Sequence, residues 1–138
     1  NVMTLKGIDI RNMLVDENGK LLILDPGKMT YRPAMEDLAR FIMTCEIIYW
    51  GSFWFFFQFP LNHRLVEATM DGYGDLDSSE IELFRVYRLK ETLKHWKAAR
   101  IALSLKVWPG IFRWIVAGIY IDPFYRARAL RRLEELEI

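Results

Sequence analysis

Residues 7–27 read GIDIRNMLVDENGKLLILDPG, and this stretch decides the fold of the N-terminal part of the chain. Two short apolar runs, Met-Leu-Val and Leu-Leu-Ile-Leu, flank an acidic segment that ends in Asn18-Gly19. Glycine supplies the positive φ that a tight turn between two strands needs. The pattern therefore predicts a β-hairpin over residues 8–25.

Downstream of the hairpin, apolar residues recur every three or four positions, which predicts helices separated by glycine and proline. The predicted helices run from Pro33 to about Ile47, from Leu61 to Tyr73, from about Leu76 to Leu103, from Ile111 to Ile121 and from Asp122 to Glu137. The predicted fold class is α+β, mainly α. A small β-hairpin precedes about five helices, and residues 1–138 form a single domain.

Composition excludes several classes of protein. The chain is 52% apolar and 14% aromatic, which allows one sizeable core and excludes intrinsic disorder. Its 19 basic residues balance 18 acidic ones, so nucleic acid is not an expected partner. The single cysteine, Cys45, cannot form an internal disulfide, so we expect a cytoplasmic location.

An aromatic stretch, residues 41–59, is about as long as the ~20 residues that a membrane-spanning helix needs. Glu46 lies within it, and an unpaired carboxylate would cost roughly 2.5 kcal/mol or more in a bilayer. A span is therefore not expected. Two alternatives stay open: two elements broken at Gly51-Ser52 bury these rings in the core, or the rings from Trp50 to Phe59 form an exposed lip for a lipid, a sugar or a partner, which would associate the chain with a membrane surface.

Two oxygen-bearing side chains mark the open end of the predicted hairpin. Asn12 begins the first strand, and Asp25 follows the second strand thirteen positions later, so the hairpin should bring them together. Mg²⁺ prefers oxygen ligands and often takes only one or two from the protein when a nucleotide supplies phosphate. The pair is a candidate magnesium site, although Asn at a strand start and Asp in a turn also occur for structural reasons.

Three segments together resemble a known family. Asn12-Met13-Leu14-Val15 is similar to the end of a catalytic loop, Asp25-Pro26-Gly27 to an Asp-x-Gly motif, and Asp37-Leu38-Ala39 to an Asp-Leu-Ala helix. In this order and spacing they resemble the protein-kinase-like phosphotransferases, particularly the aminoglycoside phosphotransferase and choline kinase superfamily. The resemblance implies the fold of the C-terminal lobe, with ATP and Mg²⁺ as cofactors. It implies that Asn12 and Asp25 bind the metal-bound nucleotide and that Asp37 braces the catalytic loop.

The chain departs from the family pattern at the catalytic base. Counting back from Asn12, the family's catalytic Asp position holds Gly7 and its His position holds Leu5. Asp9 is the nearest carboxylate and is a candidate base if the loop is two residues shorter than usual. A non-catalytic, pseudokinase-like binding or scaffold module, engaging a lipid or a partner through its aromatic segment, is the alternative to an enzyme.

The family's N-terminal, ATP-covering lobe has no counterpart in the sequence. We expect a fragment of a longer kinase-like protein, or a lobe completed by another chain. The resemblance implies a small-molecule acceptor, and three lysines on one face of the long helix, Lys90, Lys94 and Lys97, favour a neutral or anionic acceptor over a polycation.

Further side chains on the helices carry expectations about packing. Val86, Leu89, Leu93 and Trp96 are spaced as one apolar stripe of the long helix, and Trp96 should pack inward. In the last helix, Arg128 and Arg132 share a face suited to phosphate. We expect this helix to be held instead by three leucines, Leu130, Leu133 and Leu136.

Overall fold

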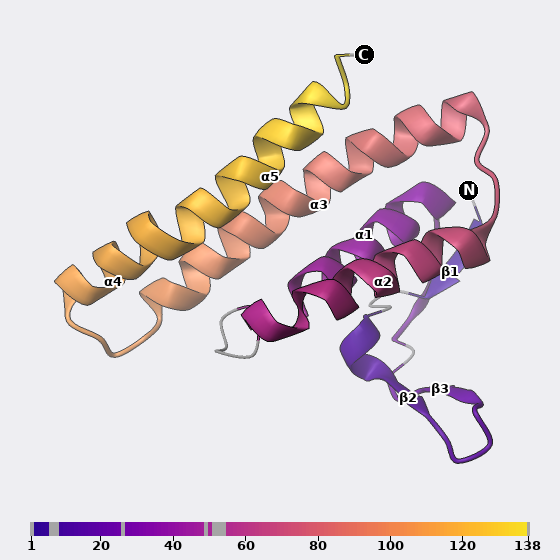
Figure 1. The fold of residues 1–138 in the computed structure, drawn as a ribbon, viewed down its shortest axis with the longest axis horizontal. Coiled ribbons are helices and arrows are strands. Elements are labelled where there is room, and N and C mark those ends of the chain that lie inside the picture. Colours follow the sequence, from indigo (N-terminus) through magenta and orange to yellow (C-terminus); the bar gives the residue numbers. More distant parts are fainter. Residues whose placement is uncertain (1, 6–8, 26, 49, 51–54, 138) are drawn as a thin grey trace. The chain divides into compact units, whose positions relative to one another are not determined.

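The computed structural model describes the chain apart from residues 1, 6–8, 26, 49, 51–54 and 138, and apart from the side chains of residues 4–5 and 55–59. The chain divides into two compact units, residues 1–84 and 85–138, and each is described by itself (Figure 1). The single domain stays a prediction. The α+β, mainly α class is confirmed.

The first unit combines short strands with two helices. It contains β1 (Val2–Leu5), a 3₁₀ turn η1 (Ile10–Asn12), β2 (Met13–Val15), β3 (Leu21–Ile23), β4 (Met29–Arg32), α1 (Ala34–Ile47), α2 (Phe55–Tyr73) and the start of α3 (Ser78–Ser104). The second unit contains the rest of α3, then α4 (Gly110–Val116), a π-helical segment η2 (Ala117–Ile121) and α5 (Asp122–Glu134).

The predicted hairpin forms as an antiparallel ladder in which Met13 pairs with Ile23. Its turn is held by Asp16, whose Oδ1 accepts hydrogen bonds from the backbone N–H groups of Asn18 and Lys20 at 2.9 and 2.8 Å. Gly19 has a φ of 79°, as the Asn-Gly pair predicts. A second antiparallel ladder, β1 with β4, was not predicted from the sequence.

Helix α1 provides the core of the first unit. Pro33 caps it, and the predicted apolar stripe is buried: Met35, Leu38, Ala39, Ile42 and Met43. Two bonds connect α1 to α2. The Asn62 side chain donates from Nδ2 to the carbonyl oxygen of Ile48, just past the end of α1, at 3.0 Å, and the Cys45 thiol is hydrogen-bonded to Thr69.

Helix α2 starts earlier than predicted, whereas α3 starts where the sequence predicts. Helix α2 begins at Phe55, six residues before the predicted Leu61. Pro60 is its sixth residue and cannot donate the helical hydrogen bond to the carbonyl four positions earlier. Helix α3 begins as predicted, with a reciprocal cap: the backbone N–H of Glu80 donates to Asp77 Oδ1, and the backbone N–H of Asp77 donates to Glu80 Oε2. The hydrogen bond from the Glu80 backbone N–H, with a second from the Ser79 hydroxyl, lowers the pKa of Asp77.

The aromatic stretch 41–59 is divided between the end of α1 and the start of α2. None of the helices in the described part of the chain has the length and apolarity to cross a membrane. The side chains of residues 51–59 lie outside the described residues, so the choice between core and aromatic lip stays a prediction.

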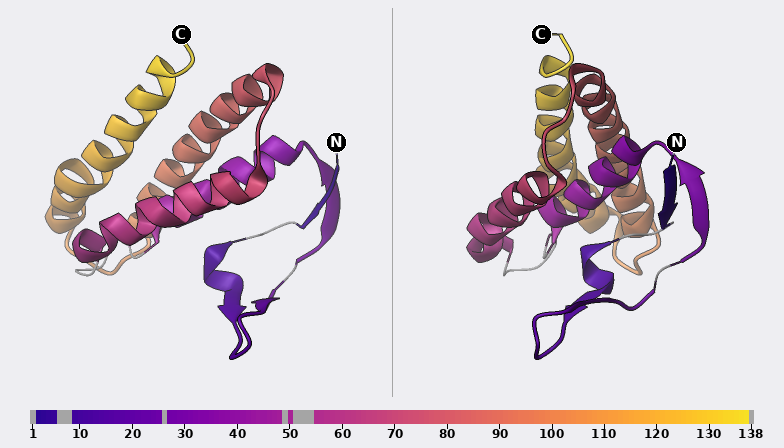
Figure 2. Two further views of the ribbon diagram at one scale, coloured as in Figure 1. Left: turned by 45° about the vertical axis from the view of Figure 1, so that its right-hand side comes forward. Right: turned by 90° about the vertical axis from the view of Figure 1, so that its right-hand side faces the viewer.

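In the second unit, α4, η2 and α5 form one continuous helical rod, and α5 runs back along α3 (Figures 1 and 2). The predicted helix start at Asp122 is confirmed, although α5 continues the preceding helical segment without a break. The π segment ends two residues before Pro123, whose ring would clash with the Ile119 carbonyl in a regular α-helix, and a widened turn relieves that clash. Asp122 joins α5 to α3 by accepting from Trp96 Nε1 at 2.8 Å and from Arg100 Nη1 at 3.0 Å.

The buried faces of α3 and α5 differ from the prediction. Tyr125, Ala129 and Arg132 form the buried line of α5, whereas the leucines expected to hold it are exposed by 50, 44 and 36%: Leu130, Leu133 and Leu136. On α3, Val86 and Leu93 of the predicted stripe are about half exposed, while Glu91 and Thr92 are buried. Trp96 is half-buried and stacks on Tyr125 with an interplanar angle of 9°.

The packing of α1 can be tested through its cysteine. Burial raises the pKa of the Cys45 thiol to about 11. The thiol should therefore stay protonated at pH 8, and the native chain should react with a thiol-labelling disulfide at least ~100-fold more slowly than the same chain unfolded in guanidinium. The stabilisation from this proton should be full below about pH 9 and lost as the pH rises toward 11. A native labelling rate equal to that of the unfolded chain would contradict this packing.

Candidate functional site

The two ladders of the first unit are nested, and this arrangement builds the candidate site. The outer ladder pairs Leu5 with Met29, and the inner ladder pairs Met13 with Ile23. Along the chain, the inner ladder therefore lies between the two strands of the outer ladder. Figure 2 shows β2 and β3 extending away from the ladder of β1 with β4.

Asn12 and Asp25 come to the same end of the hairpin. The backbone N–H of Leu24 donates to the Asn12 carbonyl oxygen at 2.8 Å, which extends the inner ladder by one position. Asp25 is the next residue after Leu24. The predicted meeting of the amide and carboxylate positions therefore agrees with the strand register.

The side chains of this pair retain the capacity to bind a ligand. Asn12 is half-buried, and its side-chain amide forms no hydrogen bond with the described residues. Asp25 is exposed, and its Oδ1 accepts one long bond, 3.3 Å, from the backbone N–H of Gly27. Gly27 turns the chain with a φ of 61°. An amide oxygen and a carboxylate are hard donors, so this donor set fits Mg²⁺.

Asp9 organises the turn that leads into Asn12. Its Oδ1 accepts from the backbone N–H of Arg11 at 2.9 Å and so caps η1. The Arg11 guanidinium also donates to both carboxylate oxygens, from Nε at 2.9 Å and from Nη2 at 2.5 Å, and these bonds raise the pKa of Arg11. The backbone N–H of Ile10 donates to Thr44 Oγ1 at 3.4 Å, which connects the turn to α1. Asp9 is thus a structural cap in this conformation, and its role as a base stays a prediction.

Asp37 lies on the first turn of α1 with its carboxylate largely buried. Its Oδ1 lies 3.7 Å from Arg40 Nη1 and accepts no hydrogen bond from the described residues. The loop that it is predicted to brace, residues 6–8, lies outside the described residues, as does Gly7 of the expected base position. A brace requires a buried carboxylate oxygen that is available as an acceptor, and the role of Asp37 as a brace stays a prediction.

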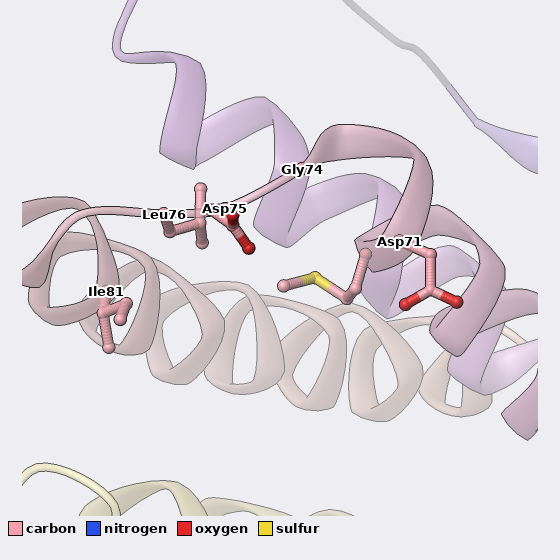
Figure 3. Close-up of a pocket in the computed structure, with 6 residues that line it drawn as sticks. Asp71, Gly74, Asp75, Leu76 and Ile81 are labelled. Atoms are coloured by element: carbon pink, nitrogen blue, oxygen red, sulfur yellow. The ribbon is translucent and has the colours of Figure 1, made fainter.

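A second feature of the first unit was not found from the sequence. An open hollow of about 530 Å³ lies where α2 turns into α3 (Figure 3). Its lining consists of Met70, Asp71, Gly74, Asp75, Leu76 and Ile81. None of these is a predicted site residue, and no group of three or more His, Cys, Asp or Glu side chains in the described part of the chain could hold a metal ion. The hollow follows from the turn at Gly74, whose φ is 93°.

The basic face of α3 is partly neutralised by its neighbours. Lys94 forms an ion pair with buried Glu91 at 3.1 Å, and Lys90 lies over the Tyr87 ring at 5.0 Å. His95 donates from Nδ1 to the Glu91 carbonyl oxygen at 2.9 Å. On α5, Arg132 is buried and bonds Glu135 at 2.6 Å, while Arg128 stacks on Phe124, so these two arginines do not form an open phosphate site.

No family model, curated protein or solved structure matches the chain. The resemblance to the kinase-like phosphotransferases therefore stays a prediction.

The cap at Asp9 gives a direct test of the site's framework. Asp9→Ala removes the acceptor for the Arg11 N–H and should accelerate amide hydrogen exchange of Arg11 and Asn12 by roughly tenfold, in line with the loss of one capping bond. Asp9→Asn keeps a capping oxygen and serves as the matched control, with a smaller effect. Equal exchange in the wild-type chain and Asp9→Ala would show that the cap does not hold this turn.

Proposed function

We propose that this chain is the metal-binding and acceptor-binding lobe of a kinase-like phosphotransferase, which transfers a phosphoryl group from ATP to a hydroxyl of a neutral or anionic small molecule. The observation that carries the proposal is the pair of nested ladders, which brings Asn12 and Asp25 to one end of a hairpin. The Asp-Leu-Ala segment supports it, since Asp37 lies on the helix that follows the outer ladder directly.

In this proposal Asn12 and Asp25 hold the cation through the amide oxygen and the carboxylate. Mg-ATP would supply the transferred phosphoryl group and the positive charge that neutralises it. The Gly27 turn lets the chain leave the site sharply after Asp25. Lys28, which follows, is exposed and is available to neutralise phosphate charge.

Proton transfer would fall to Asp9. The acceptor hydroxyl would give its proton to the Asp9 carboxylate, and this requires at least one carboxylate oxygen to exchange Arg11 for the substrate hydroxyl. Arg11 released in this way would be available to the phosphate oxygens, because its guanidinium remains charged. Phosphoryl transfer depends mainly on positioning and charge neutralisation, so a displaced base lowers the rate without abolishing it.

The exposed faces of the hairpin support a second lobe or a complementing chain as a partner. Apolar residues point to both faces of this two-stranded ladder and remain exposed by 53, 68, 41 and 61%: Leu14, Val15, Leu22 and Leu24. Strands that are apolar on both faces are typical of sheets covered on both sides. A lobe that packed over the hairpin would bury this surface.

A non-catalytic binding module is the second candidate, and a specific observation favours it. Both oxygens of the only nearby candidate base accept hydrogen bonds from Arg11, and the family's usual base position is occupied by Gly7. Such a module would keep the metal and nucleotide site and lack turnover.

The test is a titration of the chain with Mg-ADP, followed by NMR. Because one lobe supplies only part of a nucleotide cleft, we expect millimolar affinity, with the largest shifts at Asn12 and Gly27. Asp25→Asn should weaken binding at least ~10-fold, since it removes the charged ligand. Glu17→Gln neutralises an exposed carboxylate at the other end of the same hairpin and is the matched control, with unchanged affinity.

Two results would count against the proposal. If Asp25→Asn and Glu17→Gln changed the affinity for Mg-ADP equally, the proposed metal site at Asp25 would be ruled out. Micromolar affinity in this chain would show that it needs no second lobe.

A further inference from the structure

The clearest unexplained surface of the second unit is an apolar helix face turned to solvent. On α4 and η2, the positions spaced as one helical face are exposed by 70, 58, 74, 38 and 73%: Ile111, Phe112, Trp114, Ile115 and Ile119. Two residues of η2, Ala117 and Ile121, are buried. An amphipathic helix normally buries its apolar stripe, and an exposed stripe of this size marks an interaction surface.

The loop between α3 and α4 continues this surface. Leu105 is 78% exposed, Val107 is fully exposed and Trp108 is 46% exposed. Two interactions connect this loop to α4. Trp108 packs edge-to-face on Phe112 with ring centroids 6.3 Å apart, and Arg113 Nη1 donates to the Ser104 carbonyl oxygen at the end of α3 at 2.9 Å. We define residues 105–119 as the apolar tip.

The charged residues around the apolar tip are all basic. Residues 92–121 contain no Asp or Glu, and they contain five basic residues: Lys94, Lys97, Arg100, Lys106 and Arg113. Lys94 and Arg100 pair with acids just outside this range, Glu91 and Asp122. Lys97 and Lys106 form no ion pair with any of the described residues.

We propose that the apolar tip docks on an anionic membrane surface, with Lys97 and Lys106 at the lipid headgroups. An apolar face bordered by lysine and arginine, with tryptophans among its exposed residues, is typical of helices that lie in the membrane interface. The apolar run 107–121 would be about 22 Å long as a helix, short of the ~30 Å hydrocarbon core, so it lies along the surface and does not cross. This inference does not depend on the proposed phosphotransferase activity.

A second copy of the chain fits the same surface poorly. An isologous dimer through the apolar tip would bring the same lysines and arginines of two copies together with no acid in residues 92–121 to offset them. Anionic headgroups supply the missing negative charge.

The experiment is co-sedimentation of the whole chain with vesicles of phosphatidylcholine alone or with roughly one-third phosphatidylglycerol. We expect at least ~10-fold tighter partitioning to the anionic vesicles, weakened by added salt. Ile111→Gln/Ile119→Gln should reduce partitioning at least ~10-fold, because it removes two inserted side chains. Lys97→Gln/Lys106→Gln should reduce it by a similar factor on anionic vesicles only. Leu130→Gln, a half-exposed leucine on α5, is the matched control and should bind as the wild type does.

Three outcomes would overturn the proposal. Equal partitioning to neutral and anionic vesicles, or none to either, would exclude an anionic membrane. A dimer that Ile111→Gln/Ile119→Gln dissolves, without vesicle binding, would assign the surface to a second copy. A fall in the melting temperature of this variant well beyond that of Leu130→Gln would show that the apolar tip is core.

Discussion

The pairing of β1 with β4 is the constraint on which the candidate site depends. The inner hairpin, β2 with β3, forms from adjacent residues and needs only a local turn. The outer ladder joins Val2 to Arg32 and fixes both ends of the segment that contains the hairpin. Without the outer ladder, Asn12 would still lie beside Leu24, but the segments on either side of the hairpin would not be held together or set against α1.

Local sequence signals were sufficient to predict the inner hairpin and the buried face of α1. Gly19 predicted the turn, and the stripe from Met35 to Met43 predicted the buried face of α1, because both depend on residues close in the chain. The outer ladder was missed because its strands are four residues long and lie on opposite sides of the hairpin. Spacing predicted the backbone register that brings Asn12 beside Leu24, and the metal-binding role of Asn12 and Asp25 stays a prediction. The hydrogen bonds from Arg11 to Asp9 depend on side-chain geometry that spacing does not reveal.

The errors in the second unit have a common physical origin. Sequence reasoning assumed that leucines face the core and arginines face water, but Arg132 is buried beside Glu135 while Leu130 is exposed. The long stem of arginine packs like an apolar chain when its charge is paired. The apolar tip was not predicted, because the spacing of Ile111 and Ile119 predicts a helix but does not show which side of that helix faces solvent.

The apolar residues of the chain therefore form a core and two exposed surfaces. Some of them form the core around α1 and along α5. Some lie on the hairpin, where we propose that another lobe packs, and some form the apolar tip, where we propose a membrane surface. The two exposed surfaces belong to different units and serve different proposals, so a failure of one leaves the other standing.

The central claim is that two segments thirteen residues apart share one cation. Paramagnetic broadening of NMR signals by Mn²⁺, added without nucleotide, tests it most directly, because Mn²⁺ takes the same oxygen ligands as Mg²⁺. If the two residues share a cation, the Asn12 side-chain amide and the backbone amides of Asp25 and Gly27 should broaden together at the lowest Mn²⁺ concentrations. Broadening that begins at the turn carboxylates Asp16 and Glu17, and leaves Asn12 unaffected, would contradict it.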